Sequence, residues 1–312
     1  MGDRPADAPR GGAADAGSGH SGPDVSVVIV HFETPGELDR CLRALAASTA
    51  ARSLEVFLID NASRSFDVAA SERAFPGIRI IRNATNVGFA RASNQGLRLA
   101  TGRYLLLLNP DARVEPDAIA TMTAYMDARP DVGCATARLL LPDGSLDLAC
   151  RRTFPTPLRS LFRITLLSRA FPRSRTFGQY NLTYLDERQE TEIDTPCGAF
   201  MMVRAEAARE VGLLDERYFM YGEDIDWAFR LKAKGWRVMY TPAATVHHTK
   251  RASSRDRRLR TIPAFHEAMR IFYRQHYEPR YPRWVSWLTY AAIGARERLE
   301  LAALRLGRGS GS

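Results

Sequence analysis

The fold is decided by Leu105-Leu106-Leu107-Leu108-Asn109-Pro110-Asp111, an apolar run that ends on a carboxylate. Four consecutive leucines after Tyr104 are typical of a strand buried on both faces inside a parallel sheet. Proline cannot continue a central strand, so we expect pairing to stop at Pro110 and Asp111 to emerge at the carboxyl end of the sheet. Open α/β sheets bind their ligands at that edge. The alternative is that Asn109-Pro110-Asp111 is only a turn after a core strand.

Strand and helix patterns surround this segment on both sides. Apolar runs rich in β-branched residues predict strands at 25–30, 54–59, 78–82, 133–140, 198–203 and 237–240. Helical spacing predicts helices through Leu38, Leu42 and Leu45, and at 89–100, 117–127, from about 205, 263–277 and 285–306. The alternation within residues 25–108 predicts a Rossmann-like α/β sheet flanked by helices.

The composition is that of an ordinary globular protein whose positive charge is unevenly distributed. The chain of 312 residues has 44 Lys and Arg against 35 Asp and Glu, a formal charge of +9. Residues 151–175 hold seven arginines and no acid, and residues 250–312 hold fourteen basic and five acidic residues. This pattern favours an anionic surface or ligand, such as membrane lipid, diphosphate or nucleic acid. Solvated arginine-rich faces are the alternative.

The cysteines and the chain ends bear on the compartment. Cys41, Cys134, Cys150 and Cys197 show neither a CxxC pair nor metal-ligand spacing. No disulfide framework is therefore expected, and a cytoplasmic location fits. Residues 1–23 are rich in Gly, Ala, Asp and Pro without an apolar core, which predicts a disordered lead and not a signal peptide. No run of about 18 apolar residues predicts a membrane span.

Asp60 and the amide-rich segment that follows it are candidates for nucleotide binding. Asp60 ends a predicted strand beside Asn61 and Ser63. Its carboxylate can accept hydrogen bonds from a base N–H or a ribose hydroxyl, although it can also simply cap the turn. Residues 83–96 are dense in amides and glycine and then become helical, which suits a phosphate-bearing ligand. The chain has no GxGxxG or P-loop, which disfavours dinucleotide and ATP-hydrolase functions.

A cluster of acids and a pair of histidines are candidates for catalysis and metal binding. Glu223, Asp224 and Asp226 open a predicted helix. Neighbouring like charges raise one another's pKa, which suits a general base, although acids also stabilise helix N-termini. His247-His248 follow the predicted strand at 237–240. One neutral imidazole there could complete a metal shell with Asp111, and an ordinary surface pair is the alternative.

Taken in order, these motifs resemble the family 2 inverting glycosyltransferases of the GT-A fold, especially the rhamnosyltransferase-like branch. The matching segments are 25–30, 59–63, Asn86 to Ala90 with Asn94 and Gly96, Asn109-Pro110-Asp111, Gly198-Ala199-Phe200, 212–216, 219–227, Arg230 with Gly235, and His247. The resemblance implies a GT-A domain at 24–250 with a mixed, mostly parallel sheet flanked by helices. A basic helical extension at 251–306 and a flexible tail at 307–312 would follow it.

The resemblance also implies roles for individual residues. Asp224 looks like the catalytic base, with Glu223 beside it. Asp60 looks like the acid that binds the nucleotide base and ribose. Further nucleotide-sugar-binding positions are Asn61, Asn86, Gly88, Arg91, Asn94 and Asn109. Asp111 and His247 look like ligands of a divalent cation, Mg²⁺ or Mn²⁺. Asn109 stands in place of the first acid of the metal motif, and an amide binds such a cation more weakly. Tyr221, Trp227, Gly198 and Phe200 would offer apolar and stacking surface to the acceptor.

The activity implied is inverting transfer of a sugar, with rhamnose as the expected sugar, in cell-surface polysaccharide synthesis. The donor would be a nucleotide-diphosphate sugar and the acceptor a glycan or a polyprenyl-diphosphate-linked glycan, with no nucleic acid partner. Two alternatives stay open. A non-catalytic membrane scaffold would retain the fold, and a sugar nucleotidyltransferase would resemble its relatives in a Gly-x-Gly-Thr-Arg loop. His31-Phe32-Glu33-Thr34 occupy that place here, which argues against the second alternative.

The C-terminal helix is a candidate for contact with a membrane. Trp284, Trp287, Leu288 and Tyr290 accompany four arginines, Arg280, Arg283, Arg296 and Arg298. Such a helix is typical of an interfacial amphipathic segment too short in its apolar run to span a bilayer. We therefore expect a cytoplasmic protein that is peripheral on the inner face of the plasma membrane. The alternative is a helix that packs on the core.

Overall fold

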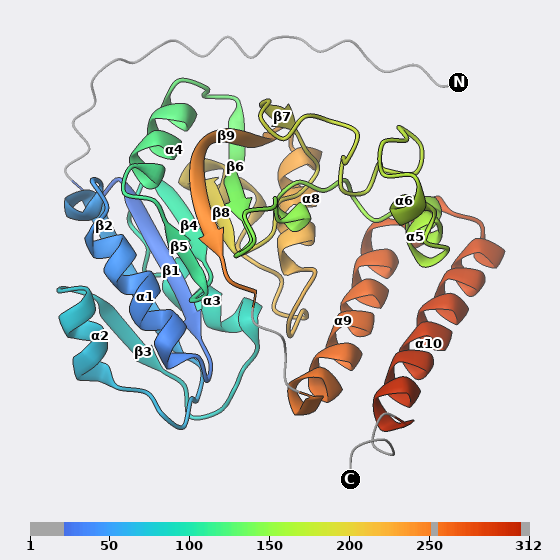
Figure 1. Cartoon of the computed structure of the whole chain (residues 1–312), viewed down its shortest axis with the longest axis horizontal. Helices are drawn as coiled ribbons and strands as arrows, with labels where there is room; N and C mark the ends of the chain where they lie inside the picture. The colour runs from blue at the N-terminus through green and yellow to red at the C-terminus, as the bar shows by residue number, and fades with distance from the viewer. Residues whose placement is uncertain (1–21, 251–254, 307–312) are drawn as a thin grey trace.

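The computed structural model describes residues 22–250 and 255–306 (Figure 1). The expected tail at 307–312, and nearly all of the expected lead at 1–23, lie outside the described residues. The GT-A domain boundaries at 24 and 250 remain a prediction, and the extension at 251–306 is described from residue 255.

The first half of the chain builds the parallel part of the sheet. The elements are β1 (Val25–His31), α1 (Pro35–Ala46), η1 (Ala51–Ser53), β2 (Leu54–Asp60), α2 (Val68–Ala74), β3 (Arg79–Arg82), α3 (Phe89–Leu97) and β4 (Tyr104–Leu108). Strands β3, β2, β1 and β4 are neighbours in that order and pair in parallel. Every residue of β4 is buried, so the leucine run is a central strand as predicted. The strand ends at Leu108, which leaves Asn109 and Asp111 at its carboxyl end.

The middle of the chain adds strands of mixed direction. The elements are β5 (Ala112–Val114), α4 (Ala118–Asp127), β6 (Val132–Leu140), η2 (Leu148–Cys150), α5 (Pro157–Ile164), α6 (Leu167–Ala170), β7 (Thr191–Glu192), β8 (Phe200–Arg204), α7 (Ala205–Val211), α8 (Glu223–Ala233) and β9 (Arg237–His248). Beyond β4 the order continues β8-β6-β9-β5, with β7 on β9. Among the described strands, β5, β7 and β8 run against the other six. The predicted mixed, mostly parallel sheet flanked by helices is confirmed (Figure 1).

Helix α3 lies very close to the sheet. A Cβ built on Gly96 would lie 3.0 Å from a side-chain carbon of Val28 and 3.1 Å from one of Ile59. Glycine therefore lets the backbone of α3 approach β1 and β2. This close packing holds the last turn of α3 against β1 and β2.

Several elements differ from the sequence prediction for reasons of long-range pairing. Helix α2 and strands β5 and β7 were not expected. Strand β5 forms because Arg113 pairs with His247 on a strand far along the chain. Strand β9 continues past Tyr240 to His248, so both histidines lie within the strand and do not follow it. Helix α9 (Arg255–His276) begins before Pro263, which lies inside it.

The C-terminal helices form a hairpin that packs on α8. After α9 come η3 (Glu278–Arg280) and α10 (Arg283–Leu306). Buried Phe272 and Tyr273 of α9, and Tyr277 just after it, form a second core with Phe229 of α8. Across the hairpin, the Tyr273 hydroxyl lies 3.1 Å from that of Ser286. In the part of the chain that the structure describes, no helix combines the length and apolarity needed to cross a membrane.

Candidate active site

Asp60 offers a free carboxylate oxygen at the carboxyl edge of the sheet. It is fully buried, and its Oδ1 accepts from the backbone N–H of Ser63 at 3.3 Å and lies 3.1 Å from Nδ1 of His31. Its Oδ2 is buried without a hydrogen-bond partner among the described residues, although Nε of Arg82 lies 3.6 Å away. Buried acceptors are normally satisfied, so this oxygen suits a ligand N–H or hydroxyl. Burial lowers the pKa of His31 despite the neighbouring carboxylate.

The amides after Asp60 shape a loop and do not point to a ligand. Asn61 donates through Nδ2 to Oδ1 of Asn86 at 2.9 Å and accepts from the backbone N–H of Val87 at 3.0 Å. Oδ1 of Asn86 also accepts from the backbone N–H of Gly88 at 3.0 Å. The predicted direct contact of Asn61 with the nucleotide sugar is therefore corrected, because its amide groups are already used to hold the loop. Asn86 keeps only its Nδ2 for a ligand.

Gly88 couples this loop to the segment before α8. Its φ is +87°, and an added Cβ would lie 2.5 Å from the carbonyl oxygen of Phe219. The next residue, Phe89, donates its backbone N–H to the same carbonyl at 2.6 Å. Only glycine fits this conformation at this distance. Gly88 therefore positions the two segments against each other.

Asn94 and Arg91 of α3 hold the segment that leads to Phe219. Asn94 is buried, donates to the Leu214 carbonyl at 2.8 Å and accepts from the Leu214 N–H at 3.1 Å. Nε of Arg91 lies 3.2 Å from Oε2 of Glu216. The predicted nucleotide contact of Asn94 is corrected, since its buried amide braces the backbone. The backbone N–H of Asn109 donates to Ala199 at 3.1 Å, which joins the end of β4 to the residues before β8.

Asp111 contacts His248, and not the predicted His247. Nε2 of His248 lies 3.3 Å from Oδ1 of Asp111, and its Nδ1 lies 2.8 Å from Oδ2 of Asp147. Successive residues of a strand point to opposite faces. His247 accordingly lies against Glu115, at 3.2 Å. Burial alone would lower the pKa of His248, but its hydrogen bonds to the two carboxylates outweigh burial and raise the pKa to about 9.

Asp111 and both histidines help to line a hollow of about 470 Å³. It is lined by Glu37, Arg40, Cys41, Asp111, Ala112, Arg113, Leu140, Leu141, Pro142, Gly144, His247, His248 and Thr249. Within the described ranges, no three His, Cys, Asp or Glu side chains are grouped to hold a metal. Mg²⁺ and Mn²⁺ are commonly bound by one or two protein groups together with substrate phosphates. The carboxylate of Asp111 fits that kind of shared site, whereas the imidazole of His248 would first have to lose the proton that its two carboxylate neighbours favour.

Asp224 and Glu223 lie buried at the start of α8 in different environments. Oδ2 of Asp224 lies 2.8 Å from Nη2 of Arg152, whose side chain is 13% exposed. Glu223 forms no ion pair with another described residue, and its Oε2 is buried without a hydrogen-bond partner among the described residues. Burial, together with the charge of Asp224, raises the pKa of Glu223 to about 8. At neutral pH Glu223 is therefore largely protonated.

Two predicted acceptor residues are core residues. Trp227 and Phe200 are both fully buried, and the Trp227 indole N–H donates to the Gly212 carbonyl at 2.9 Å. Neither ring can stack on an acceptor, so these two predictions are corrected. Tyr221 is 41% exposed and packs edge-on against Phe265, at 5.8 Å between ring centres. Gly198 is partly exposed, and an added Cβ would meet only Phe89 at ordinary distance, so both residues remain candidates.

Charges from both the Asp111–His248–Asp147 group and the Asp224–Arg152 pair act on Cys197. Burial raises the pKa of the Cys197 thiol to about 11, and the charges of Arg152, Asp147 and Asp224 all act on it. Asp147 lies against His248, which contacts Asp111, whereas Arg152 and Asp224 belong to the start of α8. Cys197 is therefore within reach of charges from both the candidate cation site and the candidate base.

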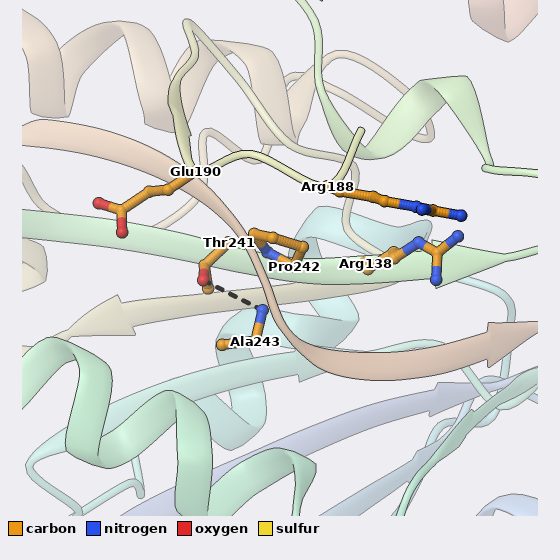
Figure 2. Close-up of a pocket in the computed structure, with 6 residues that line it drawn as sticks. All are labelled: Arg138, Arg188, Glu190, Thr241, Pro242 and Ala243. Atoms are coloured by element: carbon orange, nitrogen blue, oxygen red, sulfur yellow. Dashed lines mark hydrogen bonds between the residues drawn. The ribbon is translucent and has the colours of Figure 1, made fainter. Parts of the chain in front are cut away.

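A second hollow contains none of the predicted site residues. It has a volume of about 520 Å³ and is lined by Arg138, Arg188, Glu190, Thr241, Pro242 and Ala243. It forms where the register of β6 on β9 shifts, between the pairs Thr136–Tyr240 and Arg138–Thr245. Figure 2 shows the two arginines extending one way and Glu190 the other, which leaves no group of side chains converging on one point.

Sequence reasoning missed Arg152, His248 and Asp147. Arg152 was one of seven arginines in an acid-free run, and nothing local distinguishes it. Its position depends on a bridge to Thr195, far along the chain. The pair His247-His248 was recognised, but the choice between them depends on which face of β9 is turned to Asp111.

Comparisons with known proteins agree on one family. Residues 23–262 match a family profile described as "Glycosyltransferase like family 2". The chain is 27% identical, over 88% of its length and 92% of the relative, to an N-acetylglucosaminyl-diphospho-decaprenol L-rhamnosyltransferase of Mycobacterium tuberculosis.

Two solved structures share the fold. A mannosyltransferase of Pyrobaculum calidifontis, in complex with GDP-Man and Mn²⁺, has a TM-score of 0.57 at 16% identity, over 94% of this chain and 77% of that one. GalNAc-T7 with UDP, GalNAc and Mn²⁺ has a TM-score of 0.58 at 17% identity over 81% of this chain. This chain spans 48% of that protein's length. These likenesses establish the GT-A fold that the sequence predicted.

Proposed function

Because the chain belongs to glycosyltransferase family 2, we propose that it transfers a sugar from a nucleotide-diphosphate sugar to a hydroxyl of a lipid-linked glycan, with inversion at the anomeric carbon. The observation that carries this proposal is Asp224, a buried carboxylate at the start of α8 beside Arg152. The relative from Mycobacterium tuberculosis, a rhamnosyltransferase named for a diphospho-decaprenol acceptor, supports rhamnose as the sugar and a polyprenyl-diphosphate glycan as the acceptor.

The donor would bind at the carboxyl edge of the sheet. The unpartnered Oδ2 of Asp60 would accept a hydrogen bond from the base or the ribose of the nucleotide. The loop held by Asn61 and closed by Gly88 would form the wall beside it. Arg91 and Asn109 remain proposed as further donor contacts, because Arg91 is exposed and Asn109 is partly exposed.

Asp111 would hold a divalent cation together with the donor diphosphate, and His248 would join it after losing its proton to the cation, with His247 lining the same hollow. When bound, the cation would neutralise charge that develops on the leaving diphosphate. The two solved relatives that contain Mn²⁺ support this part of the proposal. Mg²⁺ is the alternative ion, as the hard oxygen ligands of the diphosphate suit both.

Asp224 would act as the general base. The acceptor hydroxyl oxygen forms a bond to the anomeric carbon while the bond from that carbon to the diphosphate oxygen breaks. The hydroxyl proton passes to Asp224, and the nucleoside diphosphate leaves on the opposite face, so one displacement inverts the configuration. Arg152 holds the carboxylate in position. Glu223, protonated at neutral pH, avoids a second negative charge beside it.

The acceptor would approach past Tyr221 and Gly198, which are accessible at this end of α8. An inner-face, peripheral membrane location is proposed as well, since a lipid-linked acceptor would be presented there. All four cysteines are free, in keeping with a reducing compartment.

Calorimetric titration with dTDP and with UDP, each with and without Mn²⁺, tests the donor site. Binding of one nucleotide that metal strengthens, and that Asp111→Ala loses, is the expected result. No binding of either nucleotide by the folded protein would instead favour a non-catalytic scaffold. Turnover of dTDP-rhamnose by the wild type but not by Asp224→Asn would then establish the base.

A further inference from the structure

The outward face of α10 is apolar along the whole helix. Exposed apolar side chains recur every three or four residues, at Trp284, Leu288, Ala291, Ala295, Leu299, Ala302 and Leu306, with Trp287 beside the first. Trp284 is 66% exposed and Trp287 is 70% exposed. The buried residues of the helix are Ser286 and Ile293, on the side that faces α9. A surface helix normally turns its apolar stripe inward, so this one needs a cover.

The stripe is straight. Its apolar positions repeat after 11 residues, from Trp284 to Ala295 to Leu306. That repeat corresponds to about 3.67 residues per turn, close to the 3.6 of an ideal helix, so the stripe stays on one side. An 11-residue repeat also suits a right-handed coiled coil with another helix, so the charges beside the stripe, and not the repeat, distinguish a partner helix from a flat apolar boundary.

A second exposed apolar segment lies by the turn that leads into α10. Leu158, Leu161, Leu166 and Phe171, on and around α5 and α6, are each at least half exposed. The charge of Arg159 on α5 acts on the phenol of Tyr277, just before η3. Figure 1 shows α5 and α6 beside the end of α10 that carries the tryptophans. The two apolar segments are therefore close to each other.

Unpaired arginines accompany these apolar residues. Arg169, Arg173, Arg175 and Arg283 are exposed, and none forms an ion pair with another residue that the structure describes. Residues 157–175 contain five arginines and no acid. Two such surfaces would repel each other across a symmetric dimer. The same charges would instead attract anionic lipid headgroups.

We propose that α10 and residues 157–175 form a surface that docks on a bilayer containing anionic phospholipid. The tryptophans enter the headgroup region, and the arginines bind the phosphates around it. This inference rests on the proposed function for its purpose, since a polyprenyl-diphosphate acceptor is presented at a bilayer. Helix α9 joins the docking surface to α8, because His276 of α9 lies 2.8 Å from Asp226.

Flotation of the full-length protein with vesicles tests the surface directly. Vesicles of phosphatidylcholine with phosphatidylglycerol should bind the protein more tightly than vesicles of phosphatidylcholine alone. Trp284→Ser with Trp287→Ser should weaken binding by at least about tenfold. Leu99→Ser is the matched control, since Leu99 is an exposed apolar residue of another surface, at 52% exposure.

Separate variants test how much the arginines contribute to vesicle binding. Replacing Arg169, Arg173 and Arg175 by Gln should weaken binding to phosphatidylglycerol by about fivefold for each charge removed. The control replaces three exposed arginines elsewhere, Arg52, Arg73 and Arg209, by Gln and should leave binding nearly unchanged.

Three results would overturn the proposal. One is failure of the wild type to bind phosphatidylglycerol vesicles at low salt. Another is equal loss of binding in the control variants. The third is a dimer in analytical ultracentrifugation that the tryptophan substitutions dissociate, without lipid binding, which would assign the stripe to a second copy. Transfer to a water-soluble acceptor without vesicles reports on the proposed function separately, so either idea can fail while the other stands.

Discussion

Arg152→Met removes the cation beside the proposed base while retaining most of the side chain's bulk. Nη2 of Arg152 lies 2.8 Å from Oδ2 of Asp224, and the two side chains are 13% and 10% exposed. At an effective dielectric constant of about 20, two unit charges at this separation attract by roughly 6 kcal/mol before desolvation is subtracted. Breaking a buried pair by removing one partner costs about 3–5 kcal/mol. We expect the lower end, since water reaches both groups.

The effect of Arg152→Met on kcat has an upper limit. A positioned general base contributes about 10²–10⁴-fold to the rate. Arg152→Met leaves Asp224 in place but removes the group that orients it, so we expect kcat to fall by about 100-fold, the lower bound of that range.

Release of nucleoside diphosphate measures kcat, and thermal unfolding measures the loss of stability. Arg152→Lys retains the charge and should keep kcat within about tenfold of wild type, since only the fixed position of the guanidinium between Asp224 and the Pro196 carbonyl is lost. Arg138→Met is the matched control, because Arg138 pairs with Glu187 at 2.6 Å outside the site. A folded Arg152→Met protein with unchanged kcat would refute the role given to this pair.

Three further predictions concern the donor loop and the acid pair. Gly88→Ala should lower the free energy of unfolding by about 1–3 kcal/mol and raise the donor KM, because its Cβ would collide with the Phe219 carbonyl; an unchanged melting temperature would contradict this. Asp60→Asn should weaken nucleotide binding by about tenfold in calorimetry and leave its dependence on metal unchanged. Loss of that metal dependence would contradict the assignment of Asp60 to the base or ribose. For Glu223 the pKa rises on folding to about 8, so its contribution to stability is present at low pH and is lost between about pH 4.5 and 8. Wild type should therefore lose up to about 1.4 kcal/mol per pH unit more than Glu223→Gln across that window in denaturant titrations; parallel pH profiles would exclude a protonated Glu223.

The sequence predicted what depends on local pattern. The four leucines of β4 and the break at Pro110 were sufficient to place Asp111 at the edge of a parallel sheet. The same reasoning placed Asp60 at the end of β2. Both predictions succeed because a buried strand is apolar along its length and its end is marked by residues that cannot continue it.

The errors arise where a side chain's role depends on distant partners. Trp227 has the character of a stacking residue, yet its helical position turns it into the core towards Gly212. Asn61 looked available to a ligand, but residues 25 to 27 positions later, Asn86 and Gly88, use its amide. The choice of His248 over His247 depends on the pairing of β5 with β9, a register that spacing alone does not reveal.

The acid cluster shows how three like charges fit within one helical turn. Asp226 is fully buried and paired on two sides, with Nε of Arg230 at 2.8 Å and Nε2 of His276 at 2.8 Å. Asp224 is paired with Arg152. Glu223 forms no ion pair with another described residue. Its pKa of about 8 means that it is largely protonated at neutral pH, so it needs no neighbouring cation. Burial is the larger cause of this raised pKa, and the charge of Asp224 adds to it as the crowding of acids predicted, but the group affected is Glu223. Asp224, held by Arg152, is the neighbouring acid proposed to accept a proton from an acceptor hydroxyl.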